Sequence, residues 1–242
     1  MQINEFNRDT EYWNEFYRKN PPASMQESRF ARFVTKYIEK NKTLIDAGCG
    51  NGRDSFFFNR LGLNVIGIDA SDFSVCALNK ISAENLSFVC GNFIDNPCIF
   101  KKRADYFYSR FTLHAIDAQG QTDFLKNVHD SLFDGGKLFI EVRSVHDAKF
   151  GQGEKVAENA FILDGHYRRF VSIDALLKEL LEIGFSIKYA EEEKGFAPYK
   201  NEDSQTIRIV ALKNVEQNLR GGGYKLIVKF DSHRFSLFLK KA

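Results

Sequence analysis

The chain has 242 residues, of which 43% are hydrophobic and 14% aromatic, so it can bury a core of its own without disulfides. Its 34 Lys and Arg and 32 Asp and Glu leave a formal net charge of +2, which gives no general argument for a nucleic-acid partner. The four cysteines form no Cys-X-X-Cys pair, no apolar run approaches the roughly 18 residues of a membrane span, and the polar N-terminus lacks the apolar segment of a signal peptide. We therefore expect a cytoplasmic protein with no metal site and no membrane span.

Helical and strand patterns alternate along the chain as far as residue 212. Two amphipathic helices come first, separated by Pro21 and Pro22, which a continuous helix would not tolerate. The predicted helices cover 9–19, 26–40, 53–61, 72–81, 119–132 and 172–183. The predicted strands cover 43–47, 65–68, 86–90, 106–109, 137–142, 185–190 and 206–212.

Strands that alternate with helices favour a mainly parallel sheet with helices on both faces. The segment between the last two strands has no helical periodicity, so these two strands are expected to form an antiparallel pair. The pattern therefore predicts an α/β fold with a seven-stranded sheet whose last strand is antiparallel.

The tail after Asn214 differs from the rest of the chain. A glycine run at 221–223 precedes two segments of alternating apolar and polar residues, 224–230 and 235–239, with a turn at Asp231-Ser232-His233 between them. We predict a two-stranded ribbon, either a solvated edge or a basic binding arm. Because an isolated hairpin is marginally stable, it is expected to add to a sheet edge or to form a homo-oligomer contact. The predicted regions are thus 1–41, 42–213 and 214–242.

The segment TLIDAGCGNGRDSFFF joins a buried strand to a helix through a loop rich in glycine. The strand leads into Asp46, after which Gly48, Gly50 and Gly52 alternate. Glycines at such a turn let the backbone approach a ligand closely, and the helix N-terminus offers free N–H groups. Asp69 ends the next strand, so parallel topology places its carboxylate beside the loop, where it can accept hydrogen bonds from ribose hydroxyls.

Dinucleotide oxidoreductases use a similar layout, with a loop that reads GxGxxG. Here the loop reads GxGxG, and Asp46 makes a poor environment for a pyrophosphate. An anionic Asp46 instead suits a ligand that carries an amine cation and a sulfonium.

These motifs, LIDAGCGNGRDSFFF and NVIGIDAS followed by SRFTLHAI, resemble those of class I S-adenosylmethionine-dependent methyltransferases, over about residues 12–212. The resemblance implies a Rossmann-like fold and S-adenosylmethionine as cofactor. It also implies that the loop contacts the methionine moiety, that Asp69 holds the ribose and that Ala70 lines the adenine pocket. Asn92 replaces the family's usual acid, and its carbonyl oxygen can still accept from the adenine amine. The expected cofactor residues are Trp13, Tyr17, Asp46, Gly48, Cys49, Gly50, Asp69, Ala70, Asn92, Phe93 and Ser109.

The N-terminal YWNEFY, followed by a proline turn and SRFA, resembles the helices that close over the cofactor in small-molecule methyltransferases. Residues 1–41 are therefore expected to form a helical cap. Trp13 and Tyr17 are one helical turn apart, so both rings can face a sulfonium, which cation–π attraction favours. The alternative is that these rings form a stripe of the core.

Basic residues follow two of the predicted strands at the edge that holds the glycine loop. Arg110 and His114 follow the fourth strand, and Arg143 follows the fifth. His114 has the ordinary pKa of a general base near neutrality, although it could also simply pack at a helix start. Paired guanidinium groups favour a carboxylate or phosphate. We expect His114 and Arg110 to be catalytic, and Arg110, Arg143, Tyr167 and Arg168 to bind a small anionic acceptor.

The chain lacks the (N/D)PP(Y/F) motif of many enzymes that methylate amines in nucleic acid or protein. Its wider pattern is similar to methyltransferases encoded with bacterial surface-polysaccharide genes, some of them associated with the O-methyl phosphoramidate decoration of capsules. That resemblance implies methylation of an oxygen on a small acceptor in capsule biosynthesis, with no nucleic-acid partner. The alternatives are an RNA or protein methyltransferase, or a catalytically inactive cofactor-binding domain in an assembly.

Overall fold

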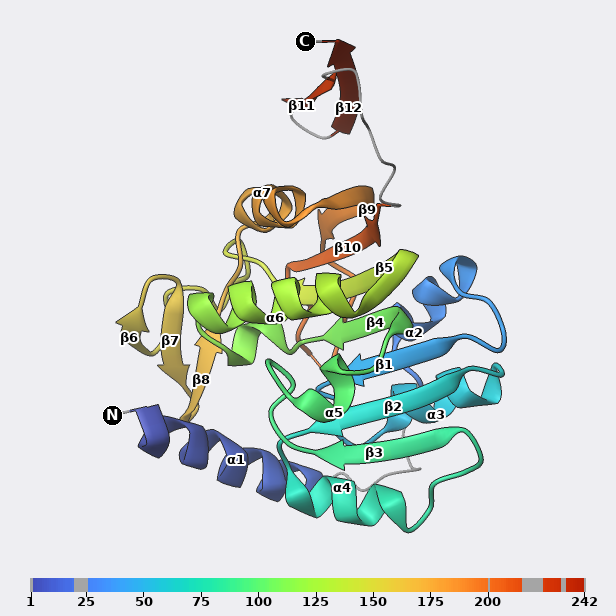
Figure 1. Cartoon of the computed structure of the whole chain (residues 1–242). Helices are drawn as coiled ribbons and strands as arrows, with labels where there is room; N and C mark the ends of the chain where they lie inside the picture. Colours follow the sequence, from blue (N-terminus) through green and yellow to red (C-terminus); the bar gives the residue numbers. More distant parts are fainter. Residues whose placement is uncertain (1, 20–25, 200, 215–223, 232–233, 242) are drawn as a thin grey trace.

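The computed structural model describes residues 2–19, 26–199, 201–214, 224–231 and 234–241, with side chains over 11–19, 26–199 and 201–214. Its centre is a seven-stranded sheet (Figure 1). In sheet order the strands are β3 (Leu86–Cys90), β2 (Asn64–Asp69), β1 (Thr43–Ala47), β4 (Ala104–Arg110), β5 (Leu132–Arg143), β10 (Thr206–Lys213) and β9 (Phe185–Glu193).

The strand directions confirm the predicted sheet. Strands β1 to β5 pair in parallel, whereas β10 is antiparallel to both of its neighbours, β5 and β9. The parallel strands all end at one edge of the sheet, so the residues at their carboxyl ends converge there.

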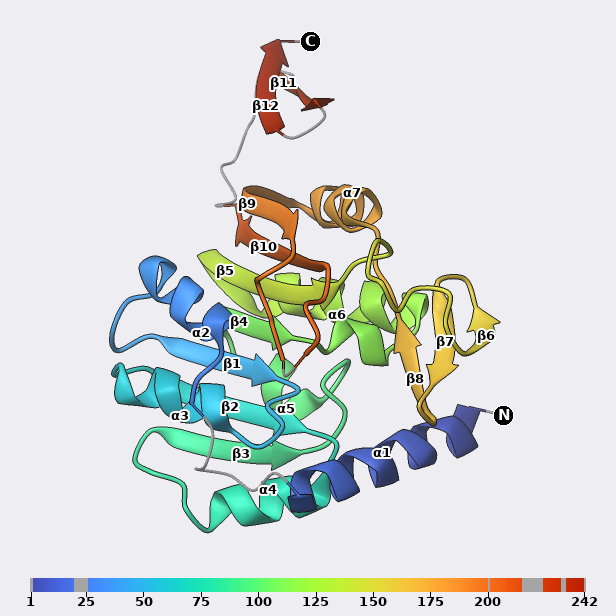
Figure 2. The ribbon, with the colours of Figure 1, turned by 180° about the vertical axis from the view of Figure 1, so that it is seen from behind.

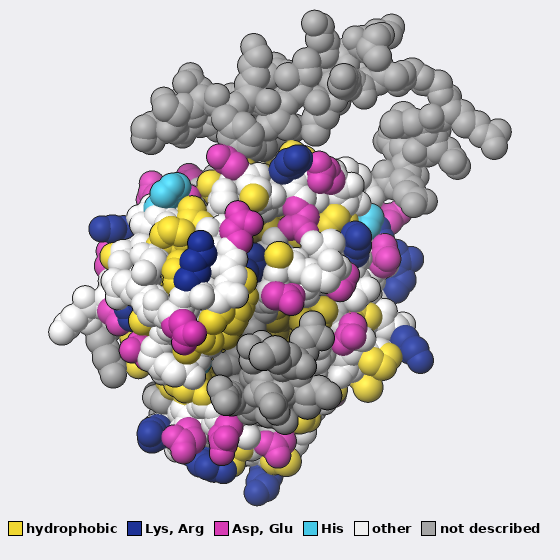
Figure 3. Space-filling model, turned by 90° about the vertical axis from the view of Figure 1, so that its left-hand side faces the viewer, with side chains coloured by type: hydrophobic (Ala, Val, Ile, Leu, Met, Phe, Trp, Pro, Cys, Tyr) yellow, Lys and Arg dark blue, Asp and Glu magenta, His cyan; other side chains and the backbone are white. Residues whose placement is uncertain are grey.

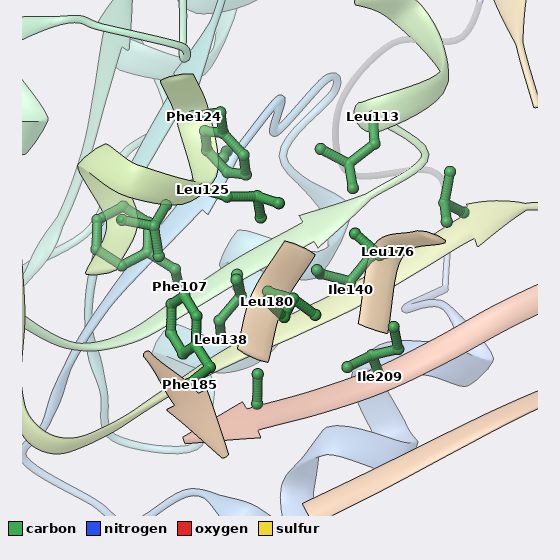
Figure 4. Close-up of a cluster of buried hydrophobic side chains, with 14 of the residues drawn as sticks. Phe107, Leu113, Phe124, Leu125, Leu138, Ile140, Leu176, Leu180, Phe185 and Ile209 are labelled. Atoms are coloured by element: carbon green, nitrogen blue, oxygen red, sulfur yellow. The ribbon is translucent and has the colours of Figure 1, made fainter. Parts of the chain in front are cut away.

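Helices cover both faces of the sheet, as the alternating pattern predicts. One face packs against α2 (Arg29–Val34), α3 (Arg53–Arg60) and α4 (Asp72–Asn79), and the other against α5 (Pro97–Phe100), α6 (Ala118–Ser131) and α7 (Ile173–Ile183) (Figures 1 and 2). Each face of the sheet has its own hydrophobic core, and neighbouring side chains of β1 contribute to both. Leu44 lies in the first core, beneath α2, α3 and α4, and Ile45 lies in the second core, beneath α5, α6 and α7. Phe107, Leu138 and Leu180 meet in the second core (Figure 4).

Capping residues set the ends of helices α2 and α7. Ser172 caps α7 by accepting from the amide of Ala175, and Gly184 ends that helix in the left-handed region, as the sequence predicts. Ser28 caps α2 in the same way, and α2 passes at its end into a 3-10 turn, η1 (Thr35–Tyr37), so it is shorter than the predicted helix over 26–40. The long N-terminal helix α1 covers Gln2–Lys19, and a second 3-10 turn, η2 (Leu113–Ala115), follows β4.

A three-stranded antiparallel sheet lies in the segment before α7, where no strand was predicted. Its strands are β6 (Glu154–Ala157), β7 (Ala160–Leu163) and β8 (His166–Arg169). Each has only four residues, and all four residues of β6 are exposed. Strands of four residues are too short to show a clear hydrophobic alternation, which explains why no strand was predicted here.

The tail forms the predicted ribbon from β11 (Tyr224–Asp231) and β12 (Arg234–Lys241), which pair in antiparallel register. The turn residues 232–233 lie outside the described residues. Among the described strands the ribbon is a sheet of its own, so the expected addition to a sheet edge of this chain is wrong. A contact with another subunit stays a prediction. No helix in the described ranges combines the length and apolar composition needed to cross a bilayer.

Candidate functional site

A cavity of about 650 Å³ lies at the carboxyl edge of the parallel strands. Figure 3 views this side of the molecule, where apolar side chains lie recessed among acidic and basic ones. The cavity reaches from the loop after β1 to β8 and to the connection between β9 and β10. We call its two parts the glycine end (Asp46, Gly48, Cys49, Gly50, Asp69 and Ala70) and the basic end (Arg143, Lys149, His166, Arg168 and Glu202).

The glycine loop adopts a backbone that only glycine takes without strain. Gly48, Gly50 and Gly52 have φ values of +71°, +56° and +76°. A Cβ on Gly48 would stand 2.2 Å from the Thr112 methyl group, and one on Gly50 would stand 2.7 Å from the Tyr17 hydroxyl. The missing side chains therefore let Thr112, two residues after β4, and Tyr17 of α1 pack directly on the loop.

Asp69 is only 8% exposed, and its carboxylate is tied to the glycine loop as the sequence predicts. One oxygen accepts from the Gly50 amide at 2.8 Å and the other from the Ser71 amide at 2.9 Å. Burial raises the pKa of Asp69, and these two hydrogen bonds oppose that rise. Each carboxylate oxygen can accept a further hydrogen bond, so the group can both fix the loop and bind two hydroxyls.

Asp46 is a second buried carboxylate at this end. Its Oδ2 accepts from the Ser55 hydroxyl at 2.6 Å. Burial raises the pKa of Asp46 to about 7, and the negative charges of Asp54 and Asp69 add to the rise. A cation placed in the cavity would therefore favour the ionised form of Asp46.

Helix α1 covers the cavity from one end to the other. Tyr17 packs over Gly50 at the glycine end, and Tyr12 stacks on His166 at the basic end with ring centroids 4.2 Å apart. Trp13 stacks on Tyr17 at 5.9 Å, and both rings line the cavity. The rings of Trp13 and Tyr17 thus face the cavity rather than the sheet core. Helix α2, the second helix of the cap expected over 1–41, packs instead in the core on one face of the sheet. Closure of α1 over a cofactor stays a prediction.

The residues expected around an adenine, Ala70, Asn92 and Phe93, all line the cavity. The side-chain oxygen of Asn92 already accepts from the Ile94 amide at 2.9 Å. One lone pair of that oxygen therefore remains for an adenine amine.

Two expected site residues, Ser109 and Tyr167, are absent from the cavity lining of the described residues. Ser109 is fully buried and shares a hydrogen bond with the Thr112 hydroxyl, so it positions the side chain that lies over Gly48. Tyr167 lies between His166 and Arg168 on β8, and the alternation of a strand turns it away from the face that those two present to the cavity.

Arg110 and Arg143 line the cavity as expected, but both are held by carboxylates of the protein. Arg110 Nε lies 2.9 Å from a Glu141 oxygen, and Glu141 is 1% exposed. Arg143 Nη1 lies 3.1 Å from Asp147 and also contacts the Ser204 hydroxyl. These pairings fix both guanidinium groups and leave each with less capacity for a ligand than the sequence indicated.

Arg168 differs from these two arginines. Its Nη2 lies 2.9 Å from Nε2 of His166, whereas its Nε and Nη1 are buried and have no hydrogen-bond partner within the described residues. Burial lowers the pKa of Arg168, and the nearby charge of Arg143 lowers it further. An unpaired buried guanidinium is costly, so a negatively charged ligand would stabilise it.

His114 lies deep in the cavity and is 6% exposed. Its Nδ1 is buried and unpaired in the part of the chain that the structure describes. Burial lowers the pKa of His114 well below its ordinary value, and the charges of Arg143, Arg168 and Arg110 lower it further. The ring is therefore neutral near pH 7, which corrects the expectation of a base with an ordinary pKa.

Several cavity residues were not predicted because they lie in loops. Lys149 follows β5, and Glu202 and the Phe196–Tyr199 segment lie between β9 and β10. No motif or periodicity marks such positions, and only the folded chain brings them together.

Comparison with known proteins identifies the family of this chain. A family model described as a methyltransferase domain matches residues 17–189, which is well over half of the chain. The chain belongs to the methyltransferase domain family. This methyltransferase-family protein is similar to an uncharacterized methyltransferase of Staphylococcus carnosus, with 29% identity over 109 residues that cover 45% of this chain and 51% of the relative. It thus spans about half the length of the curated relatives it matches.

Two crystal structures share the fold. A TehB-like SAM-dependent methyltransferase from Corynebacterium glutamicum superposes with a TM-score of 0.61 at 18% identity, covering 85% of this chain and 98% of that one. The 1,6-didemethyltoxoflavin-N1-methyltransferase of Burkholderia thailandensis, with bound 1,6-didemethyltoxoflavin and S-adenosylhomocysteine, gives 0.60 at 19% identity, covering 77% of each chain. At these identities the likeness shows the fold alone.

The residues at the glycine end fit S-adenosylmethionine. Gly48 and Gly50 carry no side chain that would fill the cavity at this loop, and Asp69 offers two acceptors to a ribose. Asp46 and the rings of Trp13 and Tyr17 suit the cationic amine and sulfonium. When bound, this cofactor supplies a methyl group on a positively charged sulfur, which is the electrophile of a methyl transfer.

The raised pKa of Asp46 predicts that cofactor binding releases a proton. Because the pKa of about 7 in the folded state exceeds the ordinary value, Asp46 contributes stability at low pH, and that contribution is lost as the pH rises through about 7. A cationic cofactor favours the ionised form, so affinity should rise with pH over the same range. Calorimetry near pH 6.5 in buffers of different ionisation heat measures the proton released. Asp46→Asn should release none, and equal release in both proteins would contradict this assignment.

Proposed function

We propose that the protein transfers the methyl group of S-adenosylmethionine to an oxygen of a small, anionic acceptor held at the basic end of the cavity. The observation that carries this proposal is Arg168, whose Nε and Nη1 are buried without a hydrogen-bond partner in the described residues. Arg168 lines the same cavity as Asp69, so a donor and an anionic acceptor would share one enclosed space. Catalysis would then rest on placing the two reactants in line and excluding water.

Two arginines of the basic end and the neighbouring His114 would have separate parts in this reaction. Arg168 would bind the anionic group of the acceptor through the N–H groups of its Nε and Nη1, and Arg143, fixed by Asp147, would lie beside the same group. His114, held neutral, would accept or donate one hydrogen bond and so orient the acceptor. An oxygen that is already ionised needs no strong base, which agrees with the low pKa of His114.

Carboxylate, phosphate and phosphoramidate oxygens all meet this description. An O-methyl phosphoramidate step in capsular polysaccharide modification is therefore one role that this chemistry would serve. A macromolecular acceptor is less well supported, because α1 covers the cavity and the net charge of the chain is only +2.

Labelled methyl transfer tests the proposal. The protein is incubated with S-adenosylmethionine labelled in the methyl group and a cell extract of small molecules, and the products are separated by anion exchange. We expect label in a low-mass anionic fraction. Arg168→Ala should lower that labelling about 10- to 150-fold, since hydrogen bonds to charged groups are lost. It should leave affinity for S-adenosylhomocysteine unchanged.

Arg60→Ala is the matched control, because Arg60 is an exposed arginine at the end of α3 and lies outside the cavity lining. This control should label as the wild type does. Label in RNA, in protein or in a neutral compound would contradict the proposal. A loss of S-adenosylhomocysteine affinity in Arg168→Ala would assign Arg168 to the carboxylate of the cofactor instead.

A further inference from the structure

We propose that Glu202 sets the charge of the acceptor, so that the basic end takes a group with one negative charge and disfavours a group with two. This inference rests on the proposed function, because it concerns the anion that Arg168 would bind. It assigns to Glu202 a role in specificity, and it narrows the acceptor to a monoanion such as a carboxylate or a singly ionised phosphate derivative.

Glu202 presents its carboxylate to the cations of the basic end. One oxygen lies 2.6 Å from Lys149 Nζ, and the other lies 3.7 Å from Arg143 Nη2. Its side chain lines the cavity and is 46% exposed. The hydrogen bond from Lys149 holds the pKa of Glu202 below its usual range, so the group is ionised near neutral pH.

The backbone builds this position. Tyr199 and Glu202 exchange two backbone hydrogen bonds of 2.9 Å, which fix the end of the connection between β9 and β10. Ser204, two residues further on, contacts Arg143 through its hydroxyl. The carboxylate of Glu202 is therefore placed at the basic end by the fold of the connection and not by a single surface ion pair.

The ion pairs at the basic end determine how much positive charge remains for a ligand. Asp147 and Glu202 offset two of the three cations Arg143, Lys149 and Arg168. Arg110 also lines the cavity but lies outside the basic end, where it shares the Glu141 carboxylate with Arg208. Within the basic end one positive charge is left in excess, and it lies on Arg168, whose Nε and Nη1 have no partner within the described residues.

A ligand with one negative charge would match that excess. Within the described residues, a second charge on the same group would find no further unpaired cation at the basic end, and Glu202 lines that part of the cavity with its own negative charge. Like charges repel, and because the Glu202 side chain is 46% exposed, water weakens this repulsion without removing it. Removing the charge of Glu202 should therefore raise the affinity for dianions far more than the affinity for monoanions.

Methanesulfonate and sulfate are matched probes, because they share a tetrahedral sulfur and carry one and two charges at any pH near neutral. Their affinities are measured by calorimetry on the full chain loaded with S-adenosylhomocysteine. We expect the wild type to bind methanesulfonate more tightly than sulfate. Glu202→Gln should shift the ratio of the two affinities about tenfold or more toward sulfate. Glu193→Gln, which removes an exposed acid of β9 outside the cavity lining, should leave the ratio unchanged.

Two results would overturn the role of Glu202 while leaving the proposed function intact. These are tighter binding of sulfate than of methanesulfonate by the wild type, and an equal gain for both anions in Glu202→Gln. A different result separates the two proposals. If neither anion binds the wild type, or if Arg168→Ala binds both as well as the wild type does, the anion site itself is absent and the proposed function fails with the inference.

Discussion

Asp69→Ala is expected to weaken binding of S-adenosylmethionine by about 1.5–3 kcal/mol, because hydrogen bonds from two ribose hydroxyls to a charged group are lost. The substitution also removes the acceptor of the Gly50 and Ser71 amides, which lie 2.8 and 2.9 Å from the carboxylate. Calorimetric titration with S-adenosylmethionine and S-adenosylhomocysteine measures the loss, which should be similar for both ligands because both carry the ribose.

Asp69→Asn separates the two roles of this carboxylate. The amide keeps the size of the side chain but only one accepting oxygen, so it can accept from the Gly50 amide or from the Ser71 amide but not from both, and the charge is lost. We expect an affinity between those of the wild type and Asp69→Ala. Wild-type affinity in Asp69→Ala, with the protein folded, would show that the ribose binds elsewhere.

Gly48→Ala should lower the free energy of unfolding by about 2–5 kcal/mol and abolish tight cofactor binding. Backbone strain and a steric clash both destabilise the folded state at this position. The φ value of +71° disfavours any residue with a Cβ, and the new Cβ would stand 2.2 Å from the methyl group of Thr112. Thr112 is itself buried and hydrogen-bonded to Ser109, so it cannot move aside without breaking that contact.

Gly151→Ala is the matched control for the backbone cost alone. Gly151 has a similar φ of +81°, but a Cβ there would meet nothing within 4 Å. We expect this control to lose about 1–2 kcal/mol and to keep its cofactor affinity. Chemical denaturation of both variants measures the difference. Equal losses would show that the close approach of Thr112 to the loop is not essential.

The fold was largely predictable because its strongest signals are local. Strands β1 and β3 match their predicted bounds, since a buried apolar run ends at a glycine loop in β1 and an alternating segment ends at Gly91 in β3. The glycine loop and Asp69 were predictable for the same reason, because strand order and chain direction alone place them side by side.

The state of the basic residues in the cavity was less predictable than the glycine loop, because it depends on pairing between distant strands. Arg110 stands opposite Glu141 in the register of β4 and β5, and Arg208 stands opposite the same Glu141 in the register of β10 and β5. Only this register shows that Arg110 shares one buried carboxylate with Arg208. The low pKa of His114 likewise arises from cations on different elements, among them Arg143 and Arg168. No residue spacing in the sequence indicates that these cations lie close to His114.

A crystal structure of the protein with S-adenosylhomocysteine and methanesulfonate tests most directly whether one cavity joins a donor site at Asp69 to an anion site at Arg168. We predict ribose hydroxyls within hydrogen-bond distance of the Asp69 carboxylate and sulfonate oxygens within hydrogen-bond distance of Nε and Nη1 of Arg168. A sulfonate bound elsewhere, or the carboxylate of the cofactor bound to Arg168, would contradict this assignment.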